Sequence, residues 1–189
     1  MSEPKIAGLV LVAGSLFFIV AASLPPTAVF AESVPIKKLT IILNAQGTWA
    51  VMQFLFALGS LVAALGIGLV AYHFRNIQGS ALAYLAFTAF VIGAALWSWH
   101  AYSRAADPNA FVEGTLPAWP FVVYTLLTLA GLLLFGLLLL RTGLPDWAGW
   151  VLIIGASLFF VLYLIFKDLP PGVHYLLTLF LGIMMYWRG

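Results

Sequence analysis

The stretch WPFVVYTLLTLAGLLLFGLLLL, residues 119–140, decides the fold of this chain. It contains no Asp, Glu, Lys or Arg, and it ends at Arg141, which is followed by Gly143 and Pro145. Gly and Pro in these positions are typical of a helix end and a turn. At about 1.5 Å of rise per residue, a helix of this length crosses the roughly 30 Å of hydrocarbon in a bilayer. The stretch therefore predicts a transmembrane helix.

Five further runs of similar length surround this one, and all eight basic and six acidic residues lie at the ends of the runs or between them. The chain is 64% hydrophobic and 7% charged, whereas a soluble domain carries roughly 25% charged residues. We therefore predict an all-α, polytopic transmembrane helix bundle that forms one membrane domain over residues 1–189. Its six spans are predicted at residues 6–24, 48–74, 80–102, 119–140, 147–166 and 172–187.

A short interfacial helix is predicted between the first two spans, at residues 34–43. Ile36, Leu39 and Leu43 recur there at helical spacing, next to Lys37 and Lys38. An apolar face beside lysines suits a helix that lies in the plane of the membrane surface, where the ammonium groups reach water.

The predicted location is the cell (inner) membrane, which the chain crosses several times. The run at residues 6–24 resembles a secretory signal, but it is longer than a typical signal core, so we expect it to be a membrane helix. Basic residues divide evenly between the two sides and fix no orientation. The lysine before the first span and the longer loops on the opposite side favour cytoplasmic termini.

The composition also excludes several classes of function. The spans contain only neutral polar residues and lack the acids and bases by which ion pumps and coupled transporters act. Cysteine is absent, which excludes thiolate metal sites and thiol redox chemistry. No basic cluster exceeds Lys37-Lys38, so nucleic-acid binding is not expected.

No catalytic motif and no metal-ligand spacing is recognisable, so we assign no catalytic and no metal-binding residue and favour a non-enzymatic module. The predicted function is the binding of lipids or other lipophilic molecules, or service as an accessory subunit of a larger membrane complex. Membrane lipids, partner transmembrane helices or a second copy of the chain are the expected partners. A small-solute carrier is a further alternative.

Two histidines suggest a cofactor site. His100 precedes the end of the predicted third span by two residues, and His174 follows the start of the sixth by two. In a six-helix topology both lie at similar depth on one side of the membrane, as axial ligands of haem b would. Gly93, seven residues before His100, would leave room for a macrocycle. The interpretation that the sequence favours is a pair of interfacial histidines, like the neighbouring tryptophans.

A polar patch near the start of the second span is a candidate site for a lipid head group or another polar ligand. It comprises Asn44, Gln46 and Gln53, of which Gln53 is the most costly to bury. A satisfied contact between helices is the alternative explanation for these residues.

The segment LLLLRTGLPDWAGW, residues 137–150, and the opening KIAGL, residues 5–9, resemble a known family. They are similar to segments of uncharacterised bacterial six-helix membrane proteins that are catalogued only as a domain of unknown function. The resemblance implies the six-helix architecture and no activity. Many such relatives carry a histidine in the fourth helix, which residues 119–140 lack.

Overall fold

A computed structural model describes residues 2–142, 145–166 and 172–188 of the chain. These residues form helices and their connections, without a strand. Residues 143 and 144, in the turn predicted after the fourth span, lie outside the described part. In chain order the elements are α1 (Glu3–Ser23), η1 (Pro25–Phe30), α2 (Pro35–Asn44), α3 (Gln46–His73), α4 (Ser80–Ala106), α5 (Pro108–Val112), α6 (Trp119–Leu139), α7 (Asp146–Phe166) and α8 (Gly172–Arg188).

The all-helical class is confirmed. Five of the predicted spans coincide with helices that are long and apolar enough to cross a membrane, namely α1, α3, α4, α6 and α7. Helix α8 has 17 described residues, so its assignment as a sixth span stays a prediction. Helix α2 covers the predicted interfacial segment, but a place at the membrane surface stays a prediction for it as well.

The connections contain more helix than the sequence suggested. Helix α4 continues past the predicted end at residue 102 to Ala106, because Arg104 packs inside the bundle instead of ending the helix. It stops before Pro108, which disfavours helical geometry in the preceding residue. The short helix α5 follows at once, and the Asp107 carboxylate caps it by accepting from the backbone N–H of Ala110 at 2.9 Å.

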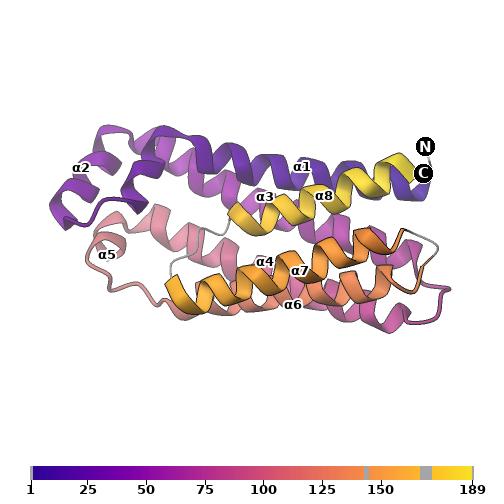
Figure 1. Cartoon of the computed structure of the whole chain (residues 1–189). Helices are drawn as coiled ribbons and strands as arrows, with labels where there is room; N and C mark the ends of the chain where they lie inside the picture. The colour runs from indigo at the N-terminus through magenta and orange to yellow at the C-terminus, as the bar shows by residue number, and fades with distance from the viewer. Residues whose placement is uncertain (1, 143–144, 167–171, 189) are drawn as a thin grey trace.

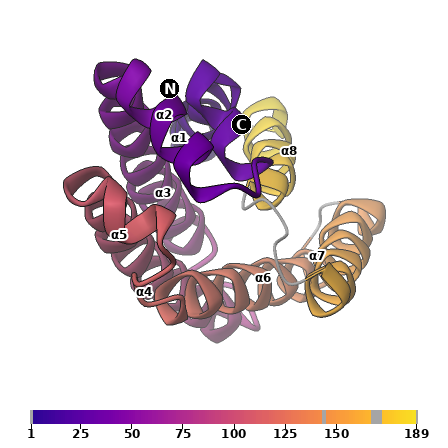
Figure 2. The same cartoon turned by 90° about the vertical axis from the view of Figure 1, so that its left-hand side faces the viewer.

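The long helices form an open ring. Seen end-on, the order around the ring is α8, α1, α3, α4, α6 and α7, and contacts between α7 and α8 are few (Figure 2). Both termini lie at one end of the bundle, and α2 and α5 lie at the other (Figure 1). We call these the terminal end and the cap end.

Helix α1 holds the ring together through glycine contacts with both neighbours. A Cβ added to Gly14 would lie 2.5 Å from the backbone nitrogen of Ala63 in α3. A Cβ added to Gly8 would lie 2.6 Å from the carbonyl oxygen of Gly182 in α8. Gly172, at the other end of α8, lies near Ala22. Helix α8 therefore runs antiparallel to α1 along most of its length.

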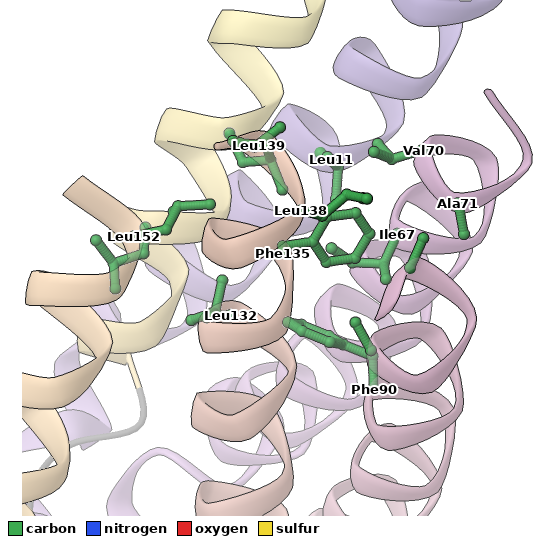
Figure 3. Close-up of a cluster of buried hydrophobic side chains, with 14 of the residues drawn as sticks. Leu11, Ile67, Val70, Ala71, Phe90, Leu132, Phe135, Leu138, Leu139 and Leu152 are labelled. Carbon is green, nitrogen blue, oxygen red and sulfur yellow. The ribbon is translucent and has the colours of Figure 1, made fainter. Parts of the chain in front are cut away.

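The core has two parts of different chemistry. Towards the terminal end it is mainly aliphatic, and Phe135 of α6 points towards Ile67 of α3 (Figure 3). Towards the cap end it is aromatic and includes Phe18, Trp97 and Tyr124. Buried polar side chains such as Gln53 and His174 lie in the described core as well, and polar groups among aromatic rings are typical of a ligand site.

Candidate functional site

Five aromatic side chains from five helices meet inside the cap-end half of the bundle. We call them the aromatic centre: Phe18 (α1), Phe56 (α3), Trp97 (α4), Tyr124 (α6) and Tyr175 (α8). All five are buried. Since each belongs to a different helix, the ring of helices positions the centre and no single element does.

The rings of the centre are in direct contact. Phe18 stacks on Tyr175 with ring centroids 3.9 Å apart, and Trp97 stacks on Tyr124 with centroids 4.8 Å apart. The hydroxyl groups of Tyr124 and Tyr175 share a hydrogen bond of 3.0 Å. Phe56 lies 4.7 Å from Phe18 and 5.9 Å from Trp97, again between centroids. Such contacts fix the rings beyond what apolar burial alone would achieve.

Arg104 reaches this centre from the last turn of α4. Its guanidinium carbon lies 4.8 Å from the centroid of the Trp97 ring, and the ring centroids of Phe30 and Phe111 are within 6 Å of the same atom. Helical side chains lean towards the helix N-terminus, which directs Arg104 towards Trp97, seven residues earlier. Only 4% of the arginine surface is exposed. The Trp49 indole N–H donates to the Arg104 carbonyl at 3.1 Å and fixes this turn against α3.

No described acid neutralises Arg104. Both salt bridges among residues 2–142, 145–166 and 172–188 involve Glu3, at the other end of the bundle. Of the acids at the cap end, Asp107 caps α5 and Glu113 is exposed. The Glu32 carboxylate accepts from the backbone N–H of Ser33 and Val34, and the bond from Val34 is the main cause that lowers the pKa of Glu32.

The aromatic rings offset only part of the cost of this burial. A cation–π contact contributes about 0.5–2 kcal/mol, whereas taking a charge out of water costs several kcal/mol. Arginine is always protonated in proteins, so it does not escape the cost by losing its proton. Arg104 is therefore a buried cation that still lacks an anion within the described part of the chain.

Further buried polar atoms around the centre also lack a hydrogen-bond partner in the structure. They include Nε1 of Trp97 and both ring nitrogens of His174. Each such group costs about 1–3 kcal/mol when it is buried without a partner. Convergent, unpaired polar groups in an apolar aromatic surrounding are the usual composition of a small-molecule site.

The two predicted haem ligands occupy different surroundings. His174 is fully buried, and its ring lies 6.4 Å from Tyr124 and 6.2 Å from Phe159 between centroids. His100 is half-buried and contacts the Trp97 ring at 5.8 Å. The contacts that connect the two histidines run through Trp97 and Tyr124. No group of three or more His, Cys, Asp or Glu in the described ranges is placed to hold a metal ion.

Gly93 serves a contact between helices in this structure. A Cβ at Gly93 would lie 3.5 Å from the Tyr124 ring and 3.6 Å from the Thr128 hydroxyl. The surface of α4 above Gly93 is therefore occupied by α6. The haem site of His100, His174 and Gly93 stays a prediction, and the ring contacts give it less support than they give a smaller ligand.

The predicted polar patch divides in two. Asn44 and Gln46 are exposed at the cap end, whereas Gln53 is buried and its amide has no hydrogen-bond partner. Gln53 lines a shallow pocket of about 170 Å³ on the outer side of α3 and α4, together with Ser98 and Tyr102. Asn44 and Gln46 do not line that pocket. A ligand site made of all three residues stays a prediction.

Sequence reasoning missed Arg104, which it placed among the charges that bound the spans. A signal for it is nevertheless present in the chain. Trp97, Ala101 and Arg104 follow one another at the spacing i, i+4, i+7, which puts them on one helix face. Ala101 is fully buried and small, so the arginine can lie across it and reach the tryptophan.

Comparisons with protein-family models, with curated proteins and with solved structures find no match for this chain. The resemblance of residues 5–9 and 137–150 to a bacterial six-helix family therefore stays a prediction.

Proposed function

We propose that this protein is a multi-pass membrane protein that binds an amphipathic molecule at the aromatic centre. The observation that carries the proposal is the convergence of buried, unpaired polar atoms on rings from five helices. The rings supply apolar contact area for a ligand, and the unpaired nitrogens of Trp97 and His174 can form hydrogen bonds with its polar group. Packing of an apolar core alone would not require these nitrogens. These contacts are those of a binding site, so the proposed activity is binding.

The proposed setting is the inner membrane, with both termini in the cytoplasm and α8 as a sixth span. Support for α8 comes from its antiparallel course along α1, from Gly172 beside Ala22 to Tyr186 beside Gly8. A helix that follows a membrane span over this distance crosses most of the same hydrocarbon. Support for α2 at the surface comes from its exposed Ile36 and Leu43 next to Lys37 and Lys38.

Native mass spectrometry of the protein released from phosphatidylcholine nanodiscs tests the proposal. We expect one molecule of added 1-dodecanol or dodecanoate per chain, and we expect Trp97→Ala to reduce the occupancy by roughly tenfold because it removes a ring and an N–H. Ile154→Ala is the matched control, since Ile154 is 61% exposed on α7. Equal loss in both variants, or no bound probe in the parent protein, would refute a specific site at the aromatic centre.

The haem alternative makes a separate prediction. If His100 and His174 held haem b, the purified protein would show a Soret band and, after dithionite reduction, a sharp α-band that His174→Ala removes. Because the histidine rings are separated by the contacts of Trp97 and Tyr124, we expect neither band. An absorption spectrum decides, and a stoichiometric band lost in both histidine variants would replace our proposal.

A further inference from the structure

The unpaired atoms of Arg104 form a defined chemical group. They are Nε and Nη2, and both are buried without a hydrogen-bond partner. In a guanidinium these two nitrogens lie on the same edge, so their N–H bonds point in nearly the same direction. That edge is the fork that donates two parallel hydrogen bonds to a carboxylate or a phosphate.

The surroundings hold the fork in one orientation. The Trp97 ring lies against the guanidinium, and the backbone of Arg104 is fixed by the hydrogen bond from Trp49. A fork held in place loses little conformational freedom when it binds, which favours a two-oxygen anion over a single acceptor.

We infer that Arg104 binds an oxyanion, and that the ligand at the aromatic centre is an anionic amphiphile whose head group occupies the Nε–Nη2 fork. This inference rests on the proposed function. The arginine supplies the positive charge and the two donors, while the contact of its guanidinium with Trp97 places the head group beside the apolar rings. The ligand class is therefore a carboxylate or phosphate that carries an apolar chain.

Two aromatic side chains from the cap end lie close to the Arg104 guanidinium, namely Phe30 and Phe111. Phe30 of η1, which contacts the guanidinium, is itself 45% exposed, and its ring meets Phe111 of α5 at 6.1 Å between centroids. Both rings belong to short elements outside the long helices. Phe30 is therefore a side chain next to the guanidinium that also reaches the surface of the described structure.

Binding of three probes to the full-length protein in phosphatidylcholine nanodiscs tests the inference. The probes are dodecanoate, dodecyl phosphate and 1-dodecanol, which have the same chain and different head groups. We expect the two anions to bind roughly tenfold to a hundredfold more tightly than the alcohol, because each anion offers the fork a negative charge and two acceptor oxygens, whereas the alcohol offers one neutral oxygen. Arg104→Lys keeps the charge and removes the fork. It should reduce the affinity for both anions by about tenfold and leave the affinity for 1-dodecanol unchanged.

A fourth probe, inorganic phosphate, identifies the source of the anion. Inorganic phosphate could raise the unfolding temperature of the parent protein and not that of Arg104→Lys. This result would support the oxyanion site and assign it to a free ion. Stabilisation by dodecanoate or dodecyl phosphate without any by phosphate would support it and assign the site to an amphiphile. If all four probes stabilise the parent and Arg104→Lys equally, the inference is wrong.

Two outcomes separate this inference from the proposed function. Equal affinity for the alcohol and the anions, with loss of both in Trp97→Ala, would leave the binding function standing and overturn the role of Arg104. Absence of binding by every probe would overturn both.

Asp168 lies outside the described residues, so Asp168→Asn is combined with Arg104→Gln in a double-mutant cycle of thermal stability. Strong coupling would mean that an internal carboxylate occupies the fork, and the inference would fail; we expect additive effects.

Discussion

Gly14→Leu is expected to disrupt the bundle, with a loss of unfolding free energy of roughly 3 kcal/mol or more. The first atom of any side chain at this position would lie 2.5 Å from the backbone nitrogen of Ala63 and 2.9 Å from the carbonyl oxygen of Gly59. Backbone atoms of α3 cannot move aside as a flexible side chain does, so α1 and α3 must separate. Membrane helices depend on such close approach, because lipid gives them no hydrophobic drive to associate.

The damage should extend to the candidate site. Phe18 follows Gly14 by one helical turn and contacts Phe56 of α3 and Tyr175 of α8 within the aromatic centre. Moving α1 away from α3 therefore separates rings that the site needs. Thermal unfolding in phosphatidylcholine nanodiscs measures the loss of stability, and native mass spectrometry with 1-dodecanol measures the loss of binding.

Gly47→Leu is the matched control for this prediction. Gly47 lies in the first turn of α3, and a Cβ there would meet nothing within 4 Å. Since leucine has a higher helix propensity than glycine, by up to about 1 kcal/mol, this variant should be as stable as the parent or slightly more stable. If the two leucine variants unfolded at the same temperature, the result would contradict the close contact between α1 and α3 at Gly14.

The five long apolar helices could be predicted because their signal is local. Each is an apolar run bounded by charged or turn-forming residues, and the run of residues 119–140 coincides with α6 to within one residue. The end of α4 could not be predicted in the same way. Apolarity stops near residue 102, whereas the helix stops where Asp107 caps the next helix and Pro108 begins it.

The aromatic centre could not be predicted because its members are brought together by the order of the helices around the ring. Tyr124 and Tyr175 are neutral polar residues within their apolar segments, and nothing in either segment indicates that their hydroxyl groups meet. The sequence favours an interfacial position for His174, which is wrong because the structure buries this ring beside those of Tyr124 and Phe159. Arg104 was assigned to the boundary of a span because a sequence shows a charge and not its burial.

His174→Leu is expected to stabilise the ligand-free protein by about 1–3 kcal/mol while it weakens ligand binding. The imidazole is fully buried, and both of its nitrogens lack a hydrogen-bond partner in the structure. Leucine fills a similar volume, needs no partner and suits the neighbouring rings of Tyr124 and Phe159. A variant that gains stability and loses binding indicates a residue with a role in function. The unpaired imidazole lowers the stability of the protein until a ligand forms hydrogen bonds with it.

His73→Leu is the control that separates this effect from a general benefit of replacing histidine by leucine. The His73 side chain is partly exposed near the terminal end, where its Nδ1 lies 3.7 Å from a carboxylate oxygen of Glu3. An exposed pair of this kind contributes about 0–1 kcal/mol, so its loss should leave stability unchanged or slightly lower. Unfolding of both variants with and without 1-dodecanol distinguishes the two explanations. A stabilised His174→Leu that still binds the probe as the parent does would show that His174 faces no ligand, and the aromatic centre would then have to bind through Trp97 and Arg104 alone.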